Sequence, residues 1–182
     1  NHKGRNRIAR LSKENGVGHY VLASSASIYG QQDNVANENS SVKPLTTYSK
    51  ANHNAEIDNL LLNDDNFTVT ALRFSSIYGV SPRMRFDTAV NKMVLDLFSK
   101  REISVSGKEN KRPFIFIKDA VKAYLTIINA PKDKINGQIF NVGSDDQNFT
   151  MGDLANKIVH SIDESCKINI QGTNDHRSYF AS

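Results

Sequence analysis

The stretch GHYVLASSASIYG, residues 18–30, decides the fold class. It opens with a short apolar run, from Tyr20 to Ala23, and passes at once into serines. A run of this kind, bounded by a glycine and by small polar residues, is typical of a parallel strand that is buried on both faces. The serines are therefore predicted to lie at the carboxyl end of a strand, which is where open α/β sheets bind their ligands.

Helical and extended segments alternate on both sides of this stretch. A basic helix is predicted over residues 3–15, and a second helix over residues 48–62 with Thr47 as its N-cap. The sequence FTVTALR, residues 67–73, predicts the next strand. Further helices are predicted over residues 87–100, 118–130 and 151–163, and a loop over residues 75–86. Short strands are predicted over residues 103–105 and 114–117 around a turn at Gly107, and an extended segment over residues 138–142. This order predicts an α/β fold with a mainly parallel sheet.

Composition and charge exclude several classes of protein. The 182 residues contain 23 Lys+Arg and 19 Asp+Glu, and a formal net charge of +4 is too small to indicate nucleic-acid binding. In the helix at 3–15, Ile8 and Leu11 are predicted to face inward and the basic residues to form a solvated face. The single cysteine, Cys166, excludes an intramolecular disulfide framework and fits a cytoplasmic location. No metal site and no membrane span are predicted.

Three hydroxyl-rich segments are predicted to lie at one edge of the sheet. They are residues 24–30, 44–48 and 74–79. Each segment alone is compatible with ordinary turns and helix caps. Because the carboxyl ends of parallel strands meet at one edge, the three together predict a binding crevice.

Five landmarks follow one another along the chain: VLASSASIYG at 21–30, PLTTYSK at 44–50 followed by Glu56, LRFSSIYG at 72–79, RPFIFIKD at 112–119, and FNVG at 140–143 with DHRSY at 175–179. In this order they resemble the extended short-chain dehydrogenase/reductases, the NAD-dependent epimerase/dehydratases of nucleotide sugars. The resemblance implies the C-terminal part of a Rossmann-like doubly wound parallel sheet, with a small mixed α/β substrate-binding region. It assigns residues 1–79 to the second half of the NAD-binding domain and residues 80–182 mainly to substrate binding, with 112–143 returning to the Rossmann sheet.

The family's Gly-rich turn, which holds the cofactor pyrophosphate at a helix N-terminus, has no counterpart in this sequence. The resemblance therefore implies that the chain is a fragment of a longer protein. The implied cofactor is NAD, with NADP left open, and the implied substrate is a nucleotide-diphosphate sugar.

The resemblance also implies the roles of particular residues. Tyr48 corresponds to the general acid/base that acts on a sugar hydroxyl, and Ser25 to the residue that hydrogen-bonds the same hydroxyl. The implied cofactor-binding residues are Tyr48, Asn52, Ser24, Phe74, Ser75 and Ser76, and the implied substrate-binding residues are Ser25, Ser27, Asn91, Arg112, Arg177 and Asp175.

One position departs from the family's Tyr-x-x-x-Lys pattern, because Asn52 stands where the lysine is expected. On a helix, position 52 lies about 40° from Tyr48, whereas Lys50 lies about 200° away and is no obvious substitute. A cation about 4 Å from the phenol would contribute up to ~4 kcal/mol to its ionisation. Asparagine can hydrogen-bond a ribose hydroxyl but carries no charge.

The reaction that these features favour is a 4-epimerisation or a 4-keto reduction. In the family's 4,6-dehydratases an Asp-Glu pair follows the catalytic hydroxyl residue, and here Ala26 and Ser27 stand at those positions. We therefore expect an NAD-dependent nucleotide-sugar epimerase. A keto-reductase or decarboxylase of the same family remains an alternative, as does a catalytically silent protein that binds dinucleotide or sugar nucleotide. A homodimer through the helices at 3–15 or 48–62 is also possible in this family.

Overall fold

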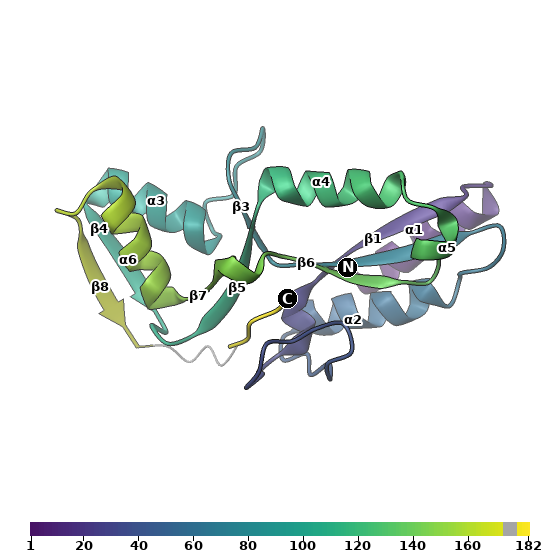
Figure 1. The fold of residues 1–182 in the computed structure, drawn as a ribbon, viewed down its shortest axis with the longest axis horizontal. Coiled ribbons are helices and arrows are strands. Elements are labelled where there is room, and N and C mark those ends of the chain that lie inside the picture. Colours follow the sequence, from purple (N-terminus) through teal and green to yellow (C-terminus); the bar gives the residue numbers. More distant parts are fainter. Residues whose placement is uncertain (173–177) are drawn as a thin grey trace.

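The computed structural model describes residues 1–172 and 178–182. A parallel sheet of three strands forms the core of one of its two lobes, on the right in Figure 1. The strand order is β1-β2-β6, and both pairings are parallel. Thr68 pairs with His19 at one end and Phe74 with Ser25 at the other, so β1 and β2 end together. The strands are β1 (His19–Ser25), β2 (Thr68–Phe74) and β6 (Ile139–Val142).

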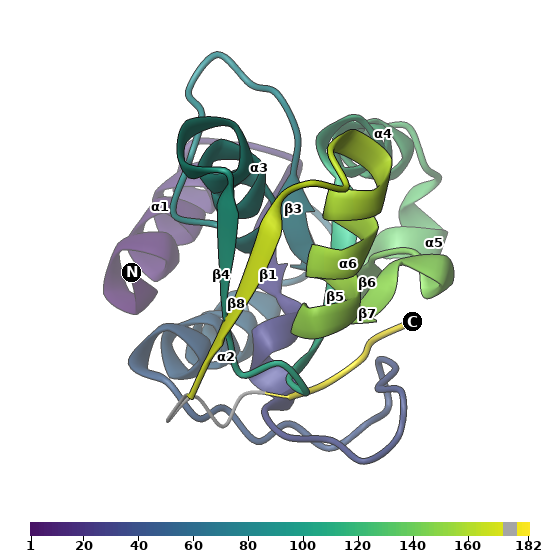
Figure 2. The same ribbon diagram turned by 90° about the vertical axis from the view of Figure 1, so that its left-hand side faces the viewer.

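Helices cover both faces of this sheet, so the sheet is doubly wound (Figures 1 and 2). Leu22 and Ala71 pack against Ala55 of α2 on one face. The next residue along β2, Leu72, belongs to the opposite cluster with Ala120 of α4. All seven residues of β2 are buried, because strands between two helical layers have no solvated face. The helices are α1 (His2–Glu14) and α2 (Thr47–Leu60) on one side, and α4 (Ile117–Ile128) and the short α5 (Lys132–Ile135) on the other.

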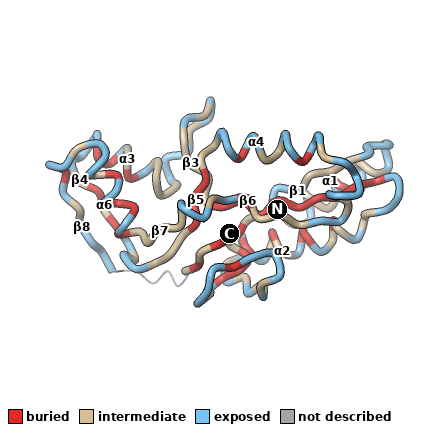
Figure 3. Tube along the Cα trace, in the orientation of Figure 1, coloured by how far each residue is buried: buried red, intermediate tan, exposed pale blue. Residues whose placement is uncertain are grey.

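A second lobe has its own core, built from α3 (Ala89–Lys100), α6 (Met151–Ile162) and a two-stranded parallel sheet. That sheet pairs β4 (Glu102–Ser106) with β8 (Lys167–Gln171). Buried residues gather in the sheets and on the inward faces of the helices, whereas outer helical faces and loops are exposed (Figure 3).

A third small sheet joins the two lobes. β5 pairs in parallel with β3 and antiparallel with β7. The strands are β3 (Ser76–Tyr78), β5 (Lys111–Phe116) and β7 (Asn148–Thr150). Two short 3-10 helices, η1 (Ala26–Tyr29) and η2 (Asp145–Gln147), follow β1 and β6.

The α/β class with parallel sheets is confirmed, but several local predictions were wrong. The predicted loop at 75–86 contains β3, and β8 was not predicted at all. The two strands around Gly107 do not pair with each other, since β4 pairs with β8 and β5 with β3 and β7. Segments distant in the sequence supply the partners of both strands.

The first helix also turns a different face to the protein. Ile8 and Leu11 are 58% and 45% exposed, whereas Ala9 is completely buried. Small Ala9 permits close packing, and His2 and Asn6 both reach Asp58 of α2. These polar contacts rotate the apolar residues of α1 outward. Among the described residues, no helix is long and apolar enough to cross a membrane.

Candidate active site

The serine-rich turn begins where β1 ends. Ser25 is the N-cap of η1, and its hydroxyl accepts a hydrogen bond from the backbone N–H of Ser27 at 3.2 Å. The same hydroxyl lies 3.0 Å from the Ser27 hydroxyl. Because side chains alternate along a strand, Ser24 points the other way, is buried, and donates to Glu56 of α2. The structure therefore places Ser25 and Ser27 at the strand end and Ser24 beneath them.

The candidate acid/base lies in the first turn of α2. Thr46, rather than the predicted Thr47, is the N-cap, because its side chain and that of Ser49 form a reciprocal capping box. Tyr48 is 51% exposed, although α2 as a whole packs on the sheet. No described residue hydrogen-bonds the Tyr48 hydroxyl, so that group is left available to a ligand.

Asn52 lies one helical turn after Tyr48 and is only 1% exposed. Its Nδ2 donates to the Tyr48 carbonyl oxygen at 2.9 Å, which is a bond within the helix. Its Oδ1 accepts from Nη1 of Arg5, a residue of α1. The position where the family pattern has a lysine is thus occupied by a buried amide. This amide accepts a hydrogen bond from a cationic side chain of another helix.

A buried ion pair supports the serine turn from below. Arg73 of β2 and Glu56 of α2 approach to 2.8 Å, with side chains 5% and 3% exposed. Burial alone would lower the pKa of Arg73, but its hydrogen bonds to Glu56 and Tyr29 and the attraction of the Glu56 carboxylate outweigh burial and raise that pKa. Arg73 also donates to the Tyr29 hydroxyl at 2.9 Å, which in turn donates to Asn141 of β6 at 2.7 Å. These bonds tie η1, β2, β6 and α2 together beneath the candidate site, and the bond from Ser24 to Glu56 adds β1.

The predicted nicotinamide neighbours follow the end of β2. Phe74 is buried, and its ring centroid lies 5.1 Å from that of Tyr124. Ser75 is buried and its backbone N–H donates to the Val142 carbonyl oxygen at 2.9 Å. Ser76 begins β3 and is partly exposed. These residues lie at the same sheet edge as Ser25, because Ser25 and Phe74 are register partners.

The predicted substrate residues lie farther along the chain. Asn91 of α3 holds the preceding loop, since its Oδ1 accepts from the Gly79 N–H at 3.2 Å and its Nδ2 donates to the Arg85 carbonyl at 2.9 Å. Arg112 of β5 lies with its guanidinium 5.7 Å from the Tyr179 ring centroid. Asp175 and Arg177, also predicted to bind substrate, lie outside the described residues.

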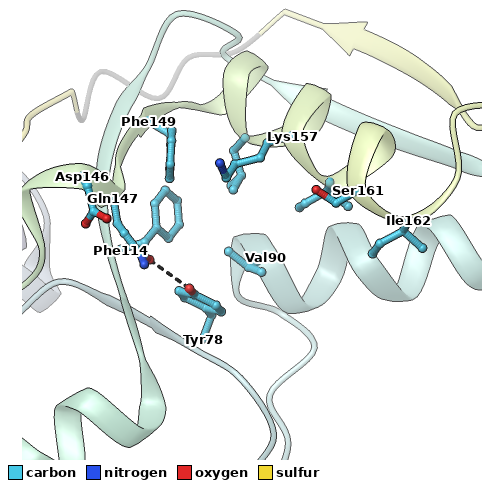
Figure 4. Close-up of a pocket in the computed structure, with 11 residues that line it drawn as sticks. Tyr78, Val90, Phe114, Asp146, Gln147, Phe149, Lys157, Ser161 and Ile162 are labelled. Atoms are coloured by element: carbon cyan, nitrogen blue, oxygen red, sulfur yellow. Dashed lines mark hydrogen bonds between the residues drawn. The ribbon is translucent and has the colours of Figure 1, made fainter.

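A separate pocket of about 300 Å³ opens between α3, α6 and β5 (Figure 4). Its wall is largely apolar, with Tyr78 donating to Gln147 at 2.9 Å and Lys157 lying 5.5 Å from the Phe149 ring centroid. None of the described residues predicted to bind cofactor or substrate lines this pocket. Within the described part of the chain, no three His, Cys, Asp or Glu side chains are grouped to hold a metal.

Arg5 contacts the candidate site residue Asn52, and the sequence interpretation had not singled it out. The basic residues of the first helix were predicted to be solvated, yet Arg5 is partly buried and turned toward α2, whereas Arg7 and Arg10 are exposed. The available signal was the spacing of His2, Arg5, Asn6 and Ala9, which places them on one helical face.

The doubly wound parallel sheet defines a Rossmann-like fold. Ser25, the half-exposed Tyr48 and the buried polar network gather at the edge where such sheets bind ligands, which makes this edge the candidate site. Comparison with known sequences gives the particular family. The chain belongs to the NAD dependent epimerase/dehydratase family, whose sequence pattern matches residues 1–143.

Individual relatives are more distant. An uncharacterized UDP-glucose epimerase, YtcB, from Bacillus subtilis is 26% identical over 139 residues, which cover 75% of this chain and 43% of that protein. UDP-D-apiose/UDP-D-xylose synthase 2 from Arabidopsis thaliana is 36% identical over 88 residues, covering 42% of this chain and 22% of the relative. The chain thus spans less than half the length of these curated relatives.

Solved structures share the fold. UDP-glucuronic acid 4-epimerase from Bacillus cereus, solved with UDP-glucuronic acid and NAD, matches with a TM-score of 0.87 at 18% identity, over all of this chain and 58% of that one. The dTDP-glucose 4,6-dehydratase DesIV from Streptomyces venezuelae, solved with NAD, matches with a TM-score of 0.85 at 18% identity, over 100% of this chain and 56% of that one. Both epimerases and dehydratases therefore share this architecture.

Proposed function

We propose that the protein containing this chain is an NAD-dependent nucleotide-sugar epimerase. The observation that carries the proposal is the Tyr48 hydroxyl, half-exposed and without a hydrogen-bond partner among the described residues, on the helix that packs beside the strand ending in Ser25. Buried tyrosines usually bond their hydroxyl to a protein group. A half-exposed phenol on the helix beside a partly exposed serine turn is free to bond a sugar hydroxyl instead.

The residues present fit a dinucleotide at this edge. Gly143 lies so close to Ser75 that a Cβ there would come within 2.5 Å of the Ser75 hydroxyl, so the turn after β6 packs closely beside the end of β2. Ser25, Ser75 and Tyr48 offer hydroxyls, and Arg5 offers a cation. When bound, NAD would accept and return the hydride of the sugar carbon.

In this proposal the chain's own groups handle the proton and the orientation. Tyr48 takes the proton of the sugar hydroxyl and returns it later, while Ser25 hydrogen-bonds the same oxygen. Ser24, Glu56 and Arg73 touch no substrate and hold the serine turn against α2. Ala26 and Ser27 offer no carboxyl group for the proton transfers of a 4,6-dehydration, which favours epimerisation.

We further propose that residues 1–79 bind the cofactor and that residues 80–182 mainly bind the sugar nucleotide. Within the second range, residues 112–143 return to the sheet of the cofactor domain. Pairing of β6 with β2 and the location of Arg112 in β5 support this division. NADP and a homodimer stay open within the proposal.

The test begins with the purified full-length protein. Acid-released NAD(H) is measured by enzymatic cycling, and UDP-, dTDP- and GDP-sugars are then assayed for epimerisation. We expect Tyr48→Phe and Ser25→Ala each to lower kcat by about 10²- to 10⁴-fold. Bound NAD(H) should stay unchanged in Ser25→Ala, because Ser25 is proposed to contact the sugar hydroxyl and not the cofactor. Tyr20→Phe and Ser99→Ala serve as matched controls and should retain activity.

A second candidate is a catalytically silent binding protein, and Asn52 is the observation that favours it. Bound NAD(H) with no conversion of any sugar nucleotide would support that candidate. A net reduction or decarboxylation would support the same-family alternatives, and absence of NAD(H) would refute the cofactor assignment.

A further inference from the structure

The partly buried cation in the first turn of α1, Arg5, has no counter-ion among the described residues. Arg5 is partly buried, and no described carboxylate pairs with it. Its one hydrogen bond goes from Nη1 to Asn52 Oδ1. A guanidinium has five N–H donors, so most of its hydrogen-bonding capacity remains free. A partly buried guanidinium with free N–H donors is suited to hydrogen-bond the oxygen atoms of a ligand.

The charge of Arg5 affects the ionisation of two tyrosine side chains that pack on the β1-β2-β6 sheet. Burial raises the pKa values of Tyr20 in β1 and Tyr124 in α4, and the attraction of Arg5 partly offsets this rise in both. The guanidinium therefore lies within electrostatic range of groups on both sides of the sheet. Arg7 and Arg10 of the same helix are exposed and have no comparable effect on these tyrosines.

Asn52 and Arg5 form a unit. The Asn52 amide is buried and uses Nδ2 on the Tyr48 carbonyl, so its Oδ1 is oriented to accept from α1. A lysine at position 52 would instead bring a second positive charge against the guanidinium. The uncharged amide at 52 and the cation at 5 are thus chemically matched.

We propose that Arg5, held by Asn52, supplies the positive charge of the dinucleotide site, in place of the lysine expected at position 52. The ligand it serves is the ribose of a nicotinamide dinucleotide, whose hydroxyl oxygens accept from the free guanidinium N–H groups. This inference rests on the proposed function for its ligand. It also implies that Asn52 marks a relocated charge rather than a degraded site. Arg5 is here a binding and positioning residue.

The experiment measures the Kd of NAD(H) by protein fluorescence or calorimetry, together with the melting temperature of each apo variant. We expect Arg5→Ala to weaken binding about tenfold or more, whereas Arg7→Ala, the matched control on the same helix, leaves Kd unchanged. Adding Asn52→Lys to Arg5→Ala should restore binding, because it returns a cation to the expected place. Asn52→Lys alone, with Arg5 present, should lower the melting temperature through like-charge repulsion.

The variant Asn52→Asp distinguishes a role of Arg5 in binding NAD(H) from a merely structural role. A carboxylate at 52 strengthens the contact with Arg5 and cancels its charge, but it gives up the hydrogen bond that Asn52 Nδ2 donates to the Tyr48 carbonyl. Because the new ion pair offsets the lost bond, we expect this variant to retain its melting temperature within a few degrees and to lose NAD(H) affinity. Unchanged affinity in Asn52→Asp or in Arg5→Ala would overturn the inference alone. Failure of the unmodified protein to bind NAD(H) would overturn both the inference and the proposed cofactor.

Discussion

Glu56→Gln tests how strongly the polar network beneath the site depends on one charge. The substitution keeps the shape of the side chain but leaves the Arg73 guanidinium buried without a counter-ion. Arg73 Nε and Nη2 lie 2.8 to 3.2 Å from the two Glu56 oxygens, and both side chains are at least nine-tenths buried. Removing one partner of such a pair costs about 3–5 kcal/mol, since an uncompensated charge remains in the interior.

For a chain of this length, each kcal/mol corresponds to about 2–4 °C in melting temperature, so Glu56→Gln should lower it by roughly 10 °C. Thermal unfolding measures the melting temperature. Urea unfolding followed by far-ultraviolet circular dichroism measures the loss in the free energy of unfolding, and its m-value should stay unaltered. Asp87→Asn is the matched control, because the Arg85–Asp87 pair is exposed and should contribute less than about 1 kcal/mol. Replacing Glu56 and Arg73 together by Met should recover much of the loss. A Glu56→Gln variant within about 1 kcal/mol of the unmodified protein would refute the reasoning.

Three further predictions concern the surroundings of the site. Gly30→Ala should destabilise the turn after η1 by more than about 1 kcal/mol, since Gly30 has a φ of +71° and a Cβ there would collide with a backbone carbonyl; chemical denaturation measures this. Asn91→Ala should raise KM with little change in melting temperature, because it releases both backbone contacts of the loop before α3; steady-state kinetics would reveal it, and an unchanged KM would contradict it. Hydrogen bonds from Lys100 and then Lys92 lower the pKa of Asp96, so its contribution to stability is present above pH 3.8 and is lost as the pH falls through the lowered pKa. The stability difference between the unmodified protein and Asp96→Asn should therefore be largest near neutral pH and vanish in acid, as measured by thermal unfolding across pH.

Local patterns were enough to predict the alternation of helices and strands, the parallel class and the family. The strand that ends in Ser25 and the helix that carries Tyr48 were both placed correctly, because an apolar run, a cap and a fixed motif spacing are short-range features. The roles assigned to Ser25, Tyr48 and the other site residues stay predictions until the variants are measured.

Only the tertiary structure determined the strand pairings and helix orientations that depend on residues far apart in the sequence. The pairing of β4 with β8 joins residues more than sixty positions apart, and nothing in residues 103–117 indicates it. The rotation of α1 is set by Ala9 packing and by the contacts of His2 and Asn6 with Asp58, so hydrophobic periodicity alone chose the wrong face. The same rotation brings Arg5 to Asn52 across 47 residues. The sequence shows that residue 5 carries a positive charge. Only the packing of α1 on α2 decides whether that charge faces water or another side chain.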